Sequence, residues 1–507
     1  MLLIYLMFTL FGGGLLAWAA DFIDETLPRW IALTSVAASL GILLIMAPQF
    51  GIDTLGARTE NTQDLIISFP WIPRFGIEFI FAVDGLSYLL LLLTSFLGLI
   101  AVASAWSEIK SRCGFFYFNL LWVLAGVVGI FTAMDMFLFF FFWEVMLIPM
   151  YFIIAIWGHE NRHYAAIKFF IFTQVSGLLM LLAIIVMAIL LAQASGALSF
   201  NYFEWRQLIA NGALDGDTSY WLMIGFFIAF VVKLPSIPFH SWLPDAHTQA
   251  PTAGSVILAG ILLKTGAYGL LRFVLPLFPE ASLEFAPVAM TLGAVSVIYG
   301  ASMALGQSDI KRLIAYSSIS HMGFVTLAVF AQTTLALQGA VMTMLAHGLS
   351  SAALFAMAGA IQHRIHTRDI NQMGGFWQSA PRFGACMLFF CLAALGLPGL
   401  ANFIGEFLVL IGSFGVSPTL TAIAALGMIC GPVYALMVMQ KVFHGEAREG
   451  LFLEDINSRE SIMLGALIIL TLYLGFYPQP TLELLEPVLV NFQQSTTPPI
   501  DAAGLAP

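Results

Sequence analysis

Long apolar segments recur along almost the whole chain, and this pattern limits the possible folds more than any other feature. A helix needs about 20 residues to cross the hydrocarbon core of a bilayer, and the 507-residue sequence supplies such runs repeatedly. With 60% hydrophobic and only 9% charged residues, it is predicted to be an all-α polytopic membrane protein with about 14 transmembrane helices. The helices are expected at residues 2–20, 30–48, 79–106, 115–133, 135–157, 164–195, 219–240 (broken), 253–276, 284–305, 309–330, 332–361, 381–413 (broken), 418–443 and 459–477.

The composition argues against several classes of function. The net charge of −10 comes from acids scattered in loops and gives no indication of nucleic-acid binding. The cysteines form no CxxC pair and have no His/Cys cluster beside them, so neither a metal site nor a disulfide framework is indicated. The sequence also lacks a Gly-rich phosphate loop after a strand, and it has no polar segment long enough for a soluble domain. We therefore expect no bound cofactor, nucleotide or metal in this chain.

The distribution of basic residues predicts the orientation. Most Lys and Arg residues fall in loops on the side that the chain reaches after its first helix, whereas the other side holds only Arg58, Arg74, Arg206 and Arg272. Because basic loops stay in the cytoplasm, both termini are expected on the opposite side of the membrane. The first helix ends in small residues that resemble a signal-peptide cleavage site, but no Lys or Arg precedes it. We therefore expect it to be retained.

The stretch from Lys233 to Thr252 interrupts an otherwise apolar helix with a lysine, four prolines and two histidines. Pro235 and Pro238 should break the span at 219–240 near its middle, because proline removes a backbone hydrogen bond and clashes with the preceding turn. Such a break must be buried in protein or face a water-filled cavity. A lysine at bilayer depth costs ~2.5–3.5 kcal/mol. The combination favours an ion pathway, and the alternative is a structural kink whose lysine reaches an interface.

A second interruption resembles the first. Lys233-Leu234-Pro235 follows a pair of phenylalanines, and Gly396-Leu397-Pro398 follows another such pair in the second half of the chain. Leu-Pro pairs are common, so the match is weak by itself. Two broken helices in two halves of a transporter nevertheless indicate ion sites near the middle of the membrane.

Three further charged residues lie in apolar surroundings, and each has a functional and a structural interpretation. Glu144 is expected to be protonated or paired with a cation, for which Lys233 is a suitable partner. The structural alternative is a protonated glutamate that only hydrogen-bonds between helices. Lys264 lies in mid-helix, where its amine cannot extend to an interface, so a functional role is favoured. The flanking Gly260 and Gly266 allow close backbone approach and room for water. Glu406 follows the second break and could exchange protons or cap the half-helix.

Two histidines in predicted spans, His321 and His347, stand beside hydroxyl residues. An ordinary pKa of about 6.5 suits the imidazole for proton relay, although membrane histidines are about as often simple hydrogen-bonding residues between helices. For His240 and His247, lining water and capping the broken backbone are equally favoured. The other histidines, His159, His163, His363, His366 and His444, are expected to be solvated in loops. The aspartates near helix ends, Asp84, Asp135 and Asp245, are more often helix caps than functional groups.

Five long motifs together resemble the antiporter-like membrane subunits of respiratory complex I, and the resemblance covers essentially the whole chain. They are Phe137–Tyr151 with Trp143-Glu144, the run Lys233–Thr252, Leu258–Gly269 with Lys264, Asp309–Gly323 with His321, and His347-Gly-Leu-Ser. The resemblance implies two inverted five-helix repeats, helices 4–8 and 9–13, each with one broken helix. The chain would then divide into residues 1–114, 115–276, 277–443 and 444–507. The resemblance also implies a hydrated polar axis along the middle of the membrane. Its proton-path residues would be Glu144, Lys233, Lys264, His321, His347 and Glu406.

The resemblance further implies a function, partners and a location. The chain would translocate protons in an NADH:quinone oxidoreductase, driven by quinone reduction elsewhere, and it would lie in the bacterial inner membrane. Other membrane-arm subunits, including sibling antiporter-like subunits, would be its partners, together with the lipid bilayer. Flavin, iron–sulfur clusters and quinone would belong to partner subunits. The alternatives are a subunit of a multisubunit Na⁺/H⁺ antiporter or of a membrane-bound hydrogenase, and a passive scaffold whose buried charges pair only structurally.

Overall fold

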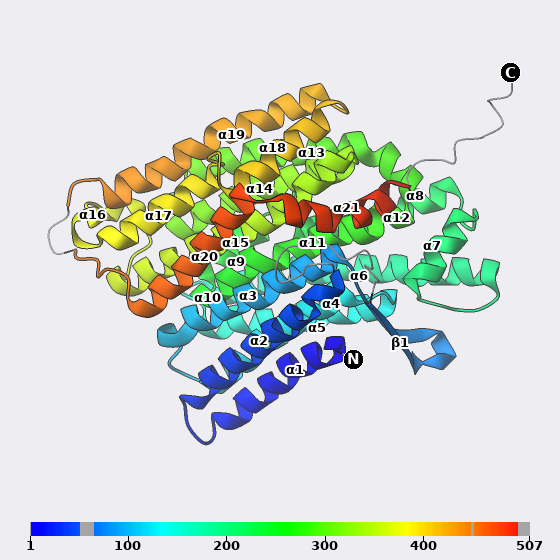
Figure 1. Cartoon of the computed structure of the whole chain (residues 1–507), viewed down its shortest axis with the longest axis horizontal. Coiled ribbons are helices and arrows are strands. Elements are labelled where there is room, and N and C mark those ends of the chain that lie inside the picture. Colours follow the sequence, from blue (N-terminus) through cyan, green and yellow to red (C-terminus); the bar gives the residue numbers. More distant parts are fainter. Residues whose placement is uncertain (1, 51–64, 448–450, 495–507) are drawn as a thin grey trace.

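The fold is an elongated bundle of membrane-spanning helices (Figure 1). A computed structural model describes residues 2–50, 65–447 and 451–494. Within these residues, twelve helices are long and apolar enough to cross a membrane, so the chain is a multi-pass membrane protein. They are α1 (Leu2–Ala20), α2 (Leu27–Met46), α3 (Gly85–Glu108), α4 (Cys113–Thr132), α5 (Met136–Trp157), α6 (Arg162–Ser195), the segment Thr252–Leu277, α13 (Pro279–Leu305), α14 (Ile310–Ala331), α15 (Thr334–Ile365), α19 (Pro418–Val438) and α20 (Ser458–Phe476).

Two further apolar segments are interrupted, as the sequence predicts. The first comprises α8 (Gly216–Lys233) and α9 (Trp242–Gln249), and the second comprises α17 (Pro381–Ala394) and α18 (Ala401–Phe414). The predicted bounds 219–240 are wrong: the first half ends at Lys233, because Pro235 and Pro238 follow, and the second half extends to Gln249. The long helices and these two broken segments give the expected fold, but the count of 14 spans is not confirmed. The division at residues 114, 276 and 443 stays a prediction.

Several smaller elements complete the described structure. Strands β1 (Leu65–Ile72) and β2 (Ile77–Val83) form an antiparallel hairpin that projects from the bundle (Figure 1). The third span therefore begins at Gly85 and not at residue 79, because 79–83 belong to β2 and Asp84 caps the helix. The remaining short elements are α7 (Tyr202–Ala210), α16 (Phe376–Ser379), α21 (Gln479–Gln494), the 3-10 turns Ala47–Phe50, Pro73–Phe75 and Ile370–Gln372, and the π turn Met439–Phe443. Arg58, one of the residues used to predict orientation, lies outside the described residues.

Helix α14 lies at the centre of the bundle. It packs against α13, α15, α9 and α18, so it contacts the second half of each broken segment. The contact with α13 is very close: a Cβ added to Gly323 would lie 2.7 Å from the carbonyl oxygen of Gly293. Only glycine permits such an approach of two backbones. Residues on α14 are thus held against both interruptions.

The segment Thr252–Leu277 is buried throughout and is not a regular α-helix. It consists of α10 (Thr252–Ile257), a π turn at Leu258–Leu262, α11 (Leu263–Gly269), a second π turn at Leu270–Val274 and α12 (Leu275–Leu277). Wide π turns inside helices often occur at functional sites. The first of them ends two residues before Lys264.

Candidate functional site

Lys264 lies in the centre of the protein with no exposed surface. Its Nζ atom donates a hydrogen bond of 2.6 Å to the carbonyl oxygen of Ala259, which belongs to the first π turn, and it lies 2.8 Å from Nδ1 of His347. The close packing expected around this lysine is present, since a Cβ on Gly266 would lie 2.4 Å from the carbonyl oxygen of Phe230 on α8. Lys264 on α11 and His347 on α15 are therefore in direct contact.

His321 on α14 continues the series. Its ring centre lies 5.4 Å from that of His347, and its Nδ1 atom lies 2.7 Å from Oε1 of Glu406 on α18. Glu406 is 2% exposed, so this carboxyl group is held inside the protein. Four of the predicted residues, Lys264, His347, His321 and Glu406, thus form one buried series across α11, α15, α14 and α18.

The position of Glu406 follows from the second helix interruption. The chain restarts as α18 at Ala401, and Gly405 lets this half-helix approach α15, since a Cβ at 405 would lie 2.6 Å from the backbone nitrogen of Thr343. On the same half-helix, Nδ2 of Asn402 donates a hydrogen bond of 3.2 Å to Oγ of Ser350. Asn402 is not among the predicted site residues, although a polar amide one turn before Glu406 in an apolar helix is a usable signal.

Lys233 and Glu144 lie apart from that series. Lys233 is the last residue of α8 and is 1% exposed; its Nζ atom has no hydrogen-bond partner in the described protein and lies 5.1 Å from the ring centre of Trp143 and 5.4 Å from that of Phe169. The half-buried carboxylate of Glu144 contacts the side chain of Gln174 on α6. No Glu144–Lys233 ion pair within 4.0 Å is present among the described residues. Their electrostatic attraction acts over a longer distance.

His247 on α9 is a buried histidine that lies near two lysines. It is fully buried, it stacks on Phe355 with a 4.4 Å centroid distance, and it lies within electrostatic range of both Lys264 and Lys311. Neither ring nitrogen has a hydrogen-bond partner in the described protein. Buried polar groups normally bind protein or ordered water. Of the two roles left open for His247, lining water therefore fits better than capping the broken backbone.

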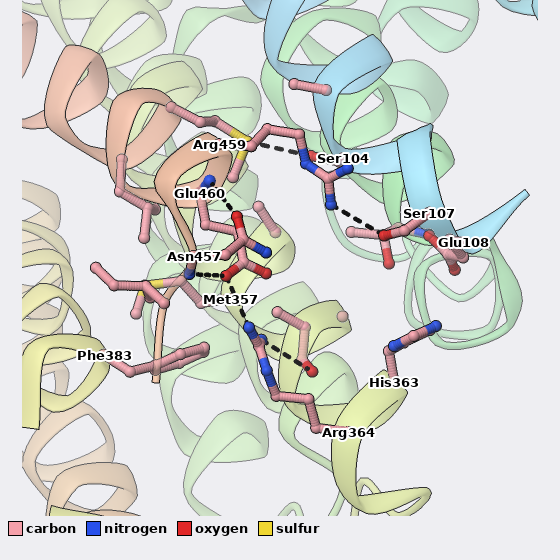
Figure 2. Close-up of a pocket in the computed structure, with 18 of the residues that line it drawn as sticks. Ser104, Ser107, Glu108, Met357, His363, Arg364, Phe383, Asn457, Arg459 and Glu460 are labelled. Carbon is pink, nitrogen blue, oxygen red and sulfur yellow. Dashed lines mark hydrogen bonds and ion pairs between the residues drawn. The ribbon is translucent and has the colours of Figure 1, made fainter. Parts of the chain in front are cut away.

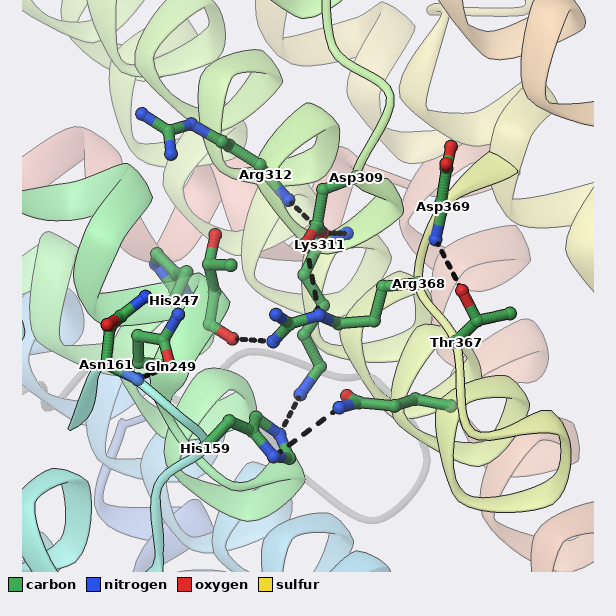
Figure 3. Close-up of polar contacts among 12 residues, drawn as sticks. His159, Asn161, His247, Gln249, Asp309, Lys311, Arg312, Thr367, Arg368 and Asp369 are labelled. Atoms are coloured by element: carbon green, nitrogen blue, oxygen red, sulfur yellow. Dashed lines mark hydrogen bonds and ion pairs between the residues drawn. The ribbon is translucent and has the colours of Figure 1, made fainter. Parts of the chain in front are cut away.

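A second buried cluster surrounds Lys311, at the start of α14 (Figure 3). Lys311 is one of the basic residues predicted to lie in loops, yet it has no exposed surface. Its Nζ atom donates a hydrogen bond of 3.2 Å to the carbonyl oxygen of Ala250, where α9 ends, and lies 3.4 Å from Nε2 of His159. Nδ1 of His159 in turn contacts the amide of Gln362 at 3.4 Å.

The expectation that His159 is solvated is therefore wrong. Burial, together with the nearby charges of Lys311 and Arg368, lowers the pKa of His159 to about 3. The histidine is neutral at ordinary pH, and its Nε2 can accept a hydrogen bond from the ammonium of Lys311. The other histidines expected in solvated loops are exposed; these are His163, His363, His366 and His444.

The aspartates at helix ends behave largely as expected. Asp84 accepts a hydrogen bond from the backbone of Ser87, and Asp135 accepts one from Leu138, so both cap helices. Asp245 on α9 differs, because its carboxylate pairs with Lys168 of α6 at 2.7 Å. Within the described part of the chain, no cluster of His, Cys, Asp and Glu side chains is suited to hold a metal ion.

Comparison with known proteins decides the family. A family model described as "NADH:quinone oxidoreductase/Mrp antiporter, TM" matches residues 133–430. The chain belongs to this family. The match includes all six predicted site residues, and the resemblance that the motifs carry is confirmed.

Relatives within the family match over nearly their whole length. "NADH-quinone oxidoreductase subunit M" of Escherichia coli K12 is 49% identical over 502 residues, covering 97% of this chain and 98% of the relative. The protein of the same name in Pseudomonas aeruginosa is also 49% identical, with the same coverage. The one in Rhodobacter capsulatus is 38% identical and covers 92% of this chain and 90% of its own.

Solved structures agree with this assignment. A chain of respiratory complex I from Thermus thermophilus with bound NADH superimposes with a TM-score of 0.87 at 30% identity, covering 98% of this chain and all of its own (100%). A chain of the membrane-bound sulfane sulfur reductase, an archaeal respiratory complex, gives 0.85 at 26% identity, covering 96% and 77%. A chain of the Mrp complex from Dietzia gives 0.80 at 22% identity, covering 98% and 52%, and this likeness shows the fold alone.

Proposed function

We propose that the chain is a proton-translocating membrane subunit of an NADH:quinone oxidoreductase. The names of its relatives support the assignment to that complex. The observation that carries the translocating role is the buried series Lys264–His347–His321–Glu406, in which neighbouring side chains lie close together or in direct contact. Groups of this kind are expensive inside a membrane and normally mark ion pathways.

The series supplies both proton donors and proton acceptors. The bond from Nζ of Lys264 to the carbonyl oxygen of Ala259 orients the amine, so that it can give a proton to Nδ1 of His347. The imidazoles of His347 and His321 can each take up a proton at one nitrogen and release one from the other. Glu406 then accepts the proton from Nδ1 of His321. No bound cofactor takes part in these steps.

Glu144 and Lys233 provide the drive for transfer in this proposal. Moving one proton against roughly 180 mV costs about 4 kcal/mol, and an ion pair at about 4 Å in an effective dielectric of about 20 is worth a similar amount before desolvation. The two side chains are separated here, with the Lys233 amine over Trp143 and the Glu144 carboxylate against Gln174. Forming and breaking this pair would change the proton affinity of Lys233, and with it the ease of transfer toward Lys264.

The setting of the chain completes the proposal. We place it in the bacterial inner membrane, with both termini on the periplasmic side because of the distribution of basic loop residues. Its partners are other membrane-arm subunits, including siblings of similar fold. Flavin, iron–sulfur clusters and quinone belong to partner subunits, and quinone reduction there drives the transfer.

The test is NADH-driven proton pumping by vesicles that contain the whole complex with Lys264→Met. Methionine keeps much of the side-chain volume but cannot carry a proton, so pumped protons per NADH should fall. The matched control is Lys441→Met, which makes the same change at an exposed position. Equal pumping by both variants, with electron transfer and assembly intact, would contradict the proposal.

The alternative is that the chain belongs to a different cation-transporting complex. The likeness to the sulfane sulfur reductase chain shows that this fold also occurs in another respiratory membrane complex. A multisubunit Na⁺/H⁺ antiporter or a membrane-bound hydrogenase would use a similar series of buried charges. Purification of the complex through this chain separates the cases. NADH-reducible flavin and iron–sulfur absorbance should accompany a subunit of NADH:quinone oxidoreductase.

A further inference from the structure

A polar pocket of about 200 Å³ opens between α3, α15 and α20 (Figure 2). A water molecule needs roughly 10–15 Å³ of such space, so the pocket has room for several. Its polar lining includes Ser104, Ser107, Glu108, Thr252, His363, Arg364, Glu454, Asn457, Arg459 and Glu460. The buried series described above does not use this pocket.

Both arginines that line the pocket already have protein partners. Arg364 pairs with Glu460 at 2.7 Å, and Arg459 donates a hydrogen bond of 2.9 Å to Ser107. Three carboxylates accompany these two arginines and His363. An anionic ligand such as a lipid phosphate is poorly matched to such a lining, whereas water and protons are well matched.

Glu108 connects the pocket with the interior. It ends α3 and is half-buried, and both of its carboxylate oxygens lie 3.1 Å from the backbone nitrogen of Thr252, which begins α10. No salt bridge within 4.0 Å to Glu108 is present in the described part of the chain. The one carboxylate of the pocket that faces the buried segment Thr252–Leu277 is thus not bound to an arginine.

Two groups lead from Glu108 toward the buried series. Lys311 lies in electrostatic range of Glu108, and its Nζ atom binds the carbonyl oxygen of Ala250, two residues before Thr252. His247 lies in range of both Lys311 and Lys264, and its ring nitrogens have no protein partner in the described residues. The route therefore runs from a polar pocket, through a carboxylate, an amine and an imidazole, to Lys264.

We propose that this pocket is the mouth through which protons reach the buried series, with Glu108 as the collecting group and Lys311 and His247 as the next carriers. The inference rests on the proposed function. The Glu108 carboxylate takes a proton from water in the pocket and becomes a carboxylate again when the proton passes to the neutral amine of Lys311. Lys311 returns to the neutral amine when His247 takes the proton, and His247 passes it to Lys264. Each carrier ends as it began, so no other reactant is needed.

The test uses the whole complex in vesicles with Glu108→Gln. Glutamine still offers an oxygen to the backbone of Thr252, so the structural contact is kept while the ionisable group is lost. NADH-driven pumping should fall by the same fraction as with Lys264→Met, with normal assembly. The matched control is Glu160→Gln, an exposed carboxylate in the loop after α5, which should pump as the parent does.

A second pair of variants tests the space itself. Ala360 is half-buried and lines the pocket, so Ala360→Phe fills part of it and should slow pumping, whereas Ala360→Val leaves most of it open. Glu108→Asp keeps an ionisable carboxylate and should pump more than Glu108→Gln. A purely structural role of Glu108 would not predict this difference.

The outcomes separate the two proposals. If Lys264→Met lowers pumping while Glu108→Gln and Ala360→Phe do not, the pocket is not the mouth and the proposed function stands. If Lys264→Met leaves pumping unchanged, the proposed function fails, and the uptake route fails with it.

Discussion

Replacing Lys233 by methionine should separate function from stability. The lysine amine is buried at the end of α8, with the rings of Trp143 and Phe169 beside it. Among the residues that the structure describes, no carboxylate lies within ion-pair distance of it. Lys233→Met removes the charge and keeps a flexible side chain of similar length. If the lysine serves proton transfer, pumping should fall strongly while the folded complex persists.

The size of the stability change follows from these surroundings. A lysine at bilayer depth costs ~2.5–3.5 kcal/mol, and each desolvated contact of its ammonium with an aromatic ring returns up to about 2 kcal/mol. The two effects nearly cancel, so Lys233→Met should change stability by less than about 2 kcal/mol. If Lys233 were instead half of a structural ion pair, removing it would cost about 3–5 kcal/mol.

The assay measures three quantities in the same membranes: assembled complex on a native gel, NADH-dependent electron transfer, and dye quenching by pumped protons. We expect near-normal assembly with a marked loss of pumped protons per NADH. Normal pumping together with poor assembly would refute the reasoning and favour the passive scaffold.

Three other changes test particular contacts. Gly405→Val should separate α18 from α15, cost about 1–3 kcal/mol and reduce pumping, because a Cβ at 405 meets the Thr343 backbone. Gly415→Ala is the control, since a Cβ at 415 meets nothing within 4 Å. Unchanged pumping by the valine variant would argue against close packing of the two helices. Burial raises the pKa of Asp455, but hydrogen bonds from Ile456, Phe383 and Arg382 more than offset this and hold the pKa below its usual value. The stabilising effect of the Asp455 carboxylate is therefore full above a pH of about 4, the pKa in the unfolded chain, and is lost as the pH falls through the lower folded pKa. Asp455→Asn should make residues 451–457 sensitive to protease already at neutral pH. Equal cleavage of the parent and the variant would contradict this. Phe492→Ala should cost about 3–5 kcal/mol and loosen α21, because the Phe492 ring lies over Arg272. The measurement is amide exchange in α21, which should become faster. An unchanged exchange rate would show that this contact does not hold the helix.

The sequence predicted the membrane-spanning architecture well because hydrophobic length is a direct physical requirement of the bilayer. It predicted both interruptions because proline cannot donate a backbone hydrogen bond. It could not predict where the first interruption begins and ends. The prolines show that the helix breaks, but the return to helical structure at Trp242 depends on packing that the local sequence does not contain.

The site was predicted in part. Lys264, His321, His347 and Glu406 stood out because ionisable residues are rare in apolar helices, and the structure brings these four together. Local sequence could not show that Glu144 and Lys233 lie beyond ion-pair distance. Lys311 was missed because it stands near other charges in the sequence, where solvation is the common case. Its position two residues after Asp309, the cap of α14, already placed it inside a helix.

The two membrane interruptions share one mechanical support. Helix α14 touches both α9 and α18, the segments that resume after each break. Neither α9 nor α18 can shift or tilt without repacking against α14, which also contacts the other of the two. A displacement of one half-helix can therefore be transmitted to the other through α14 by direct packing, in addition to any electrostatic coupling between the buried charges.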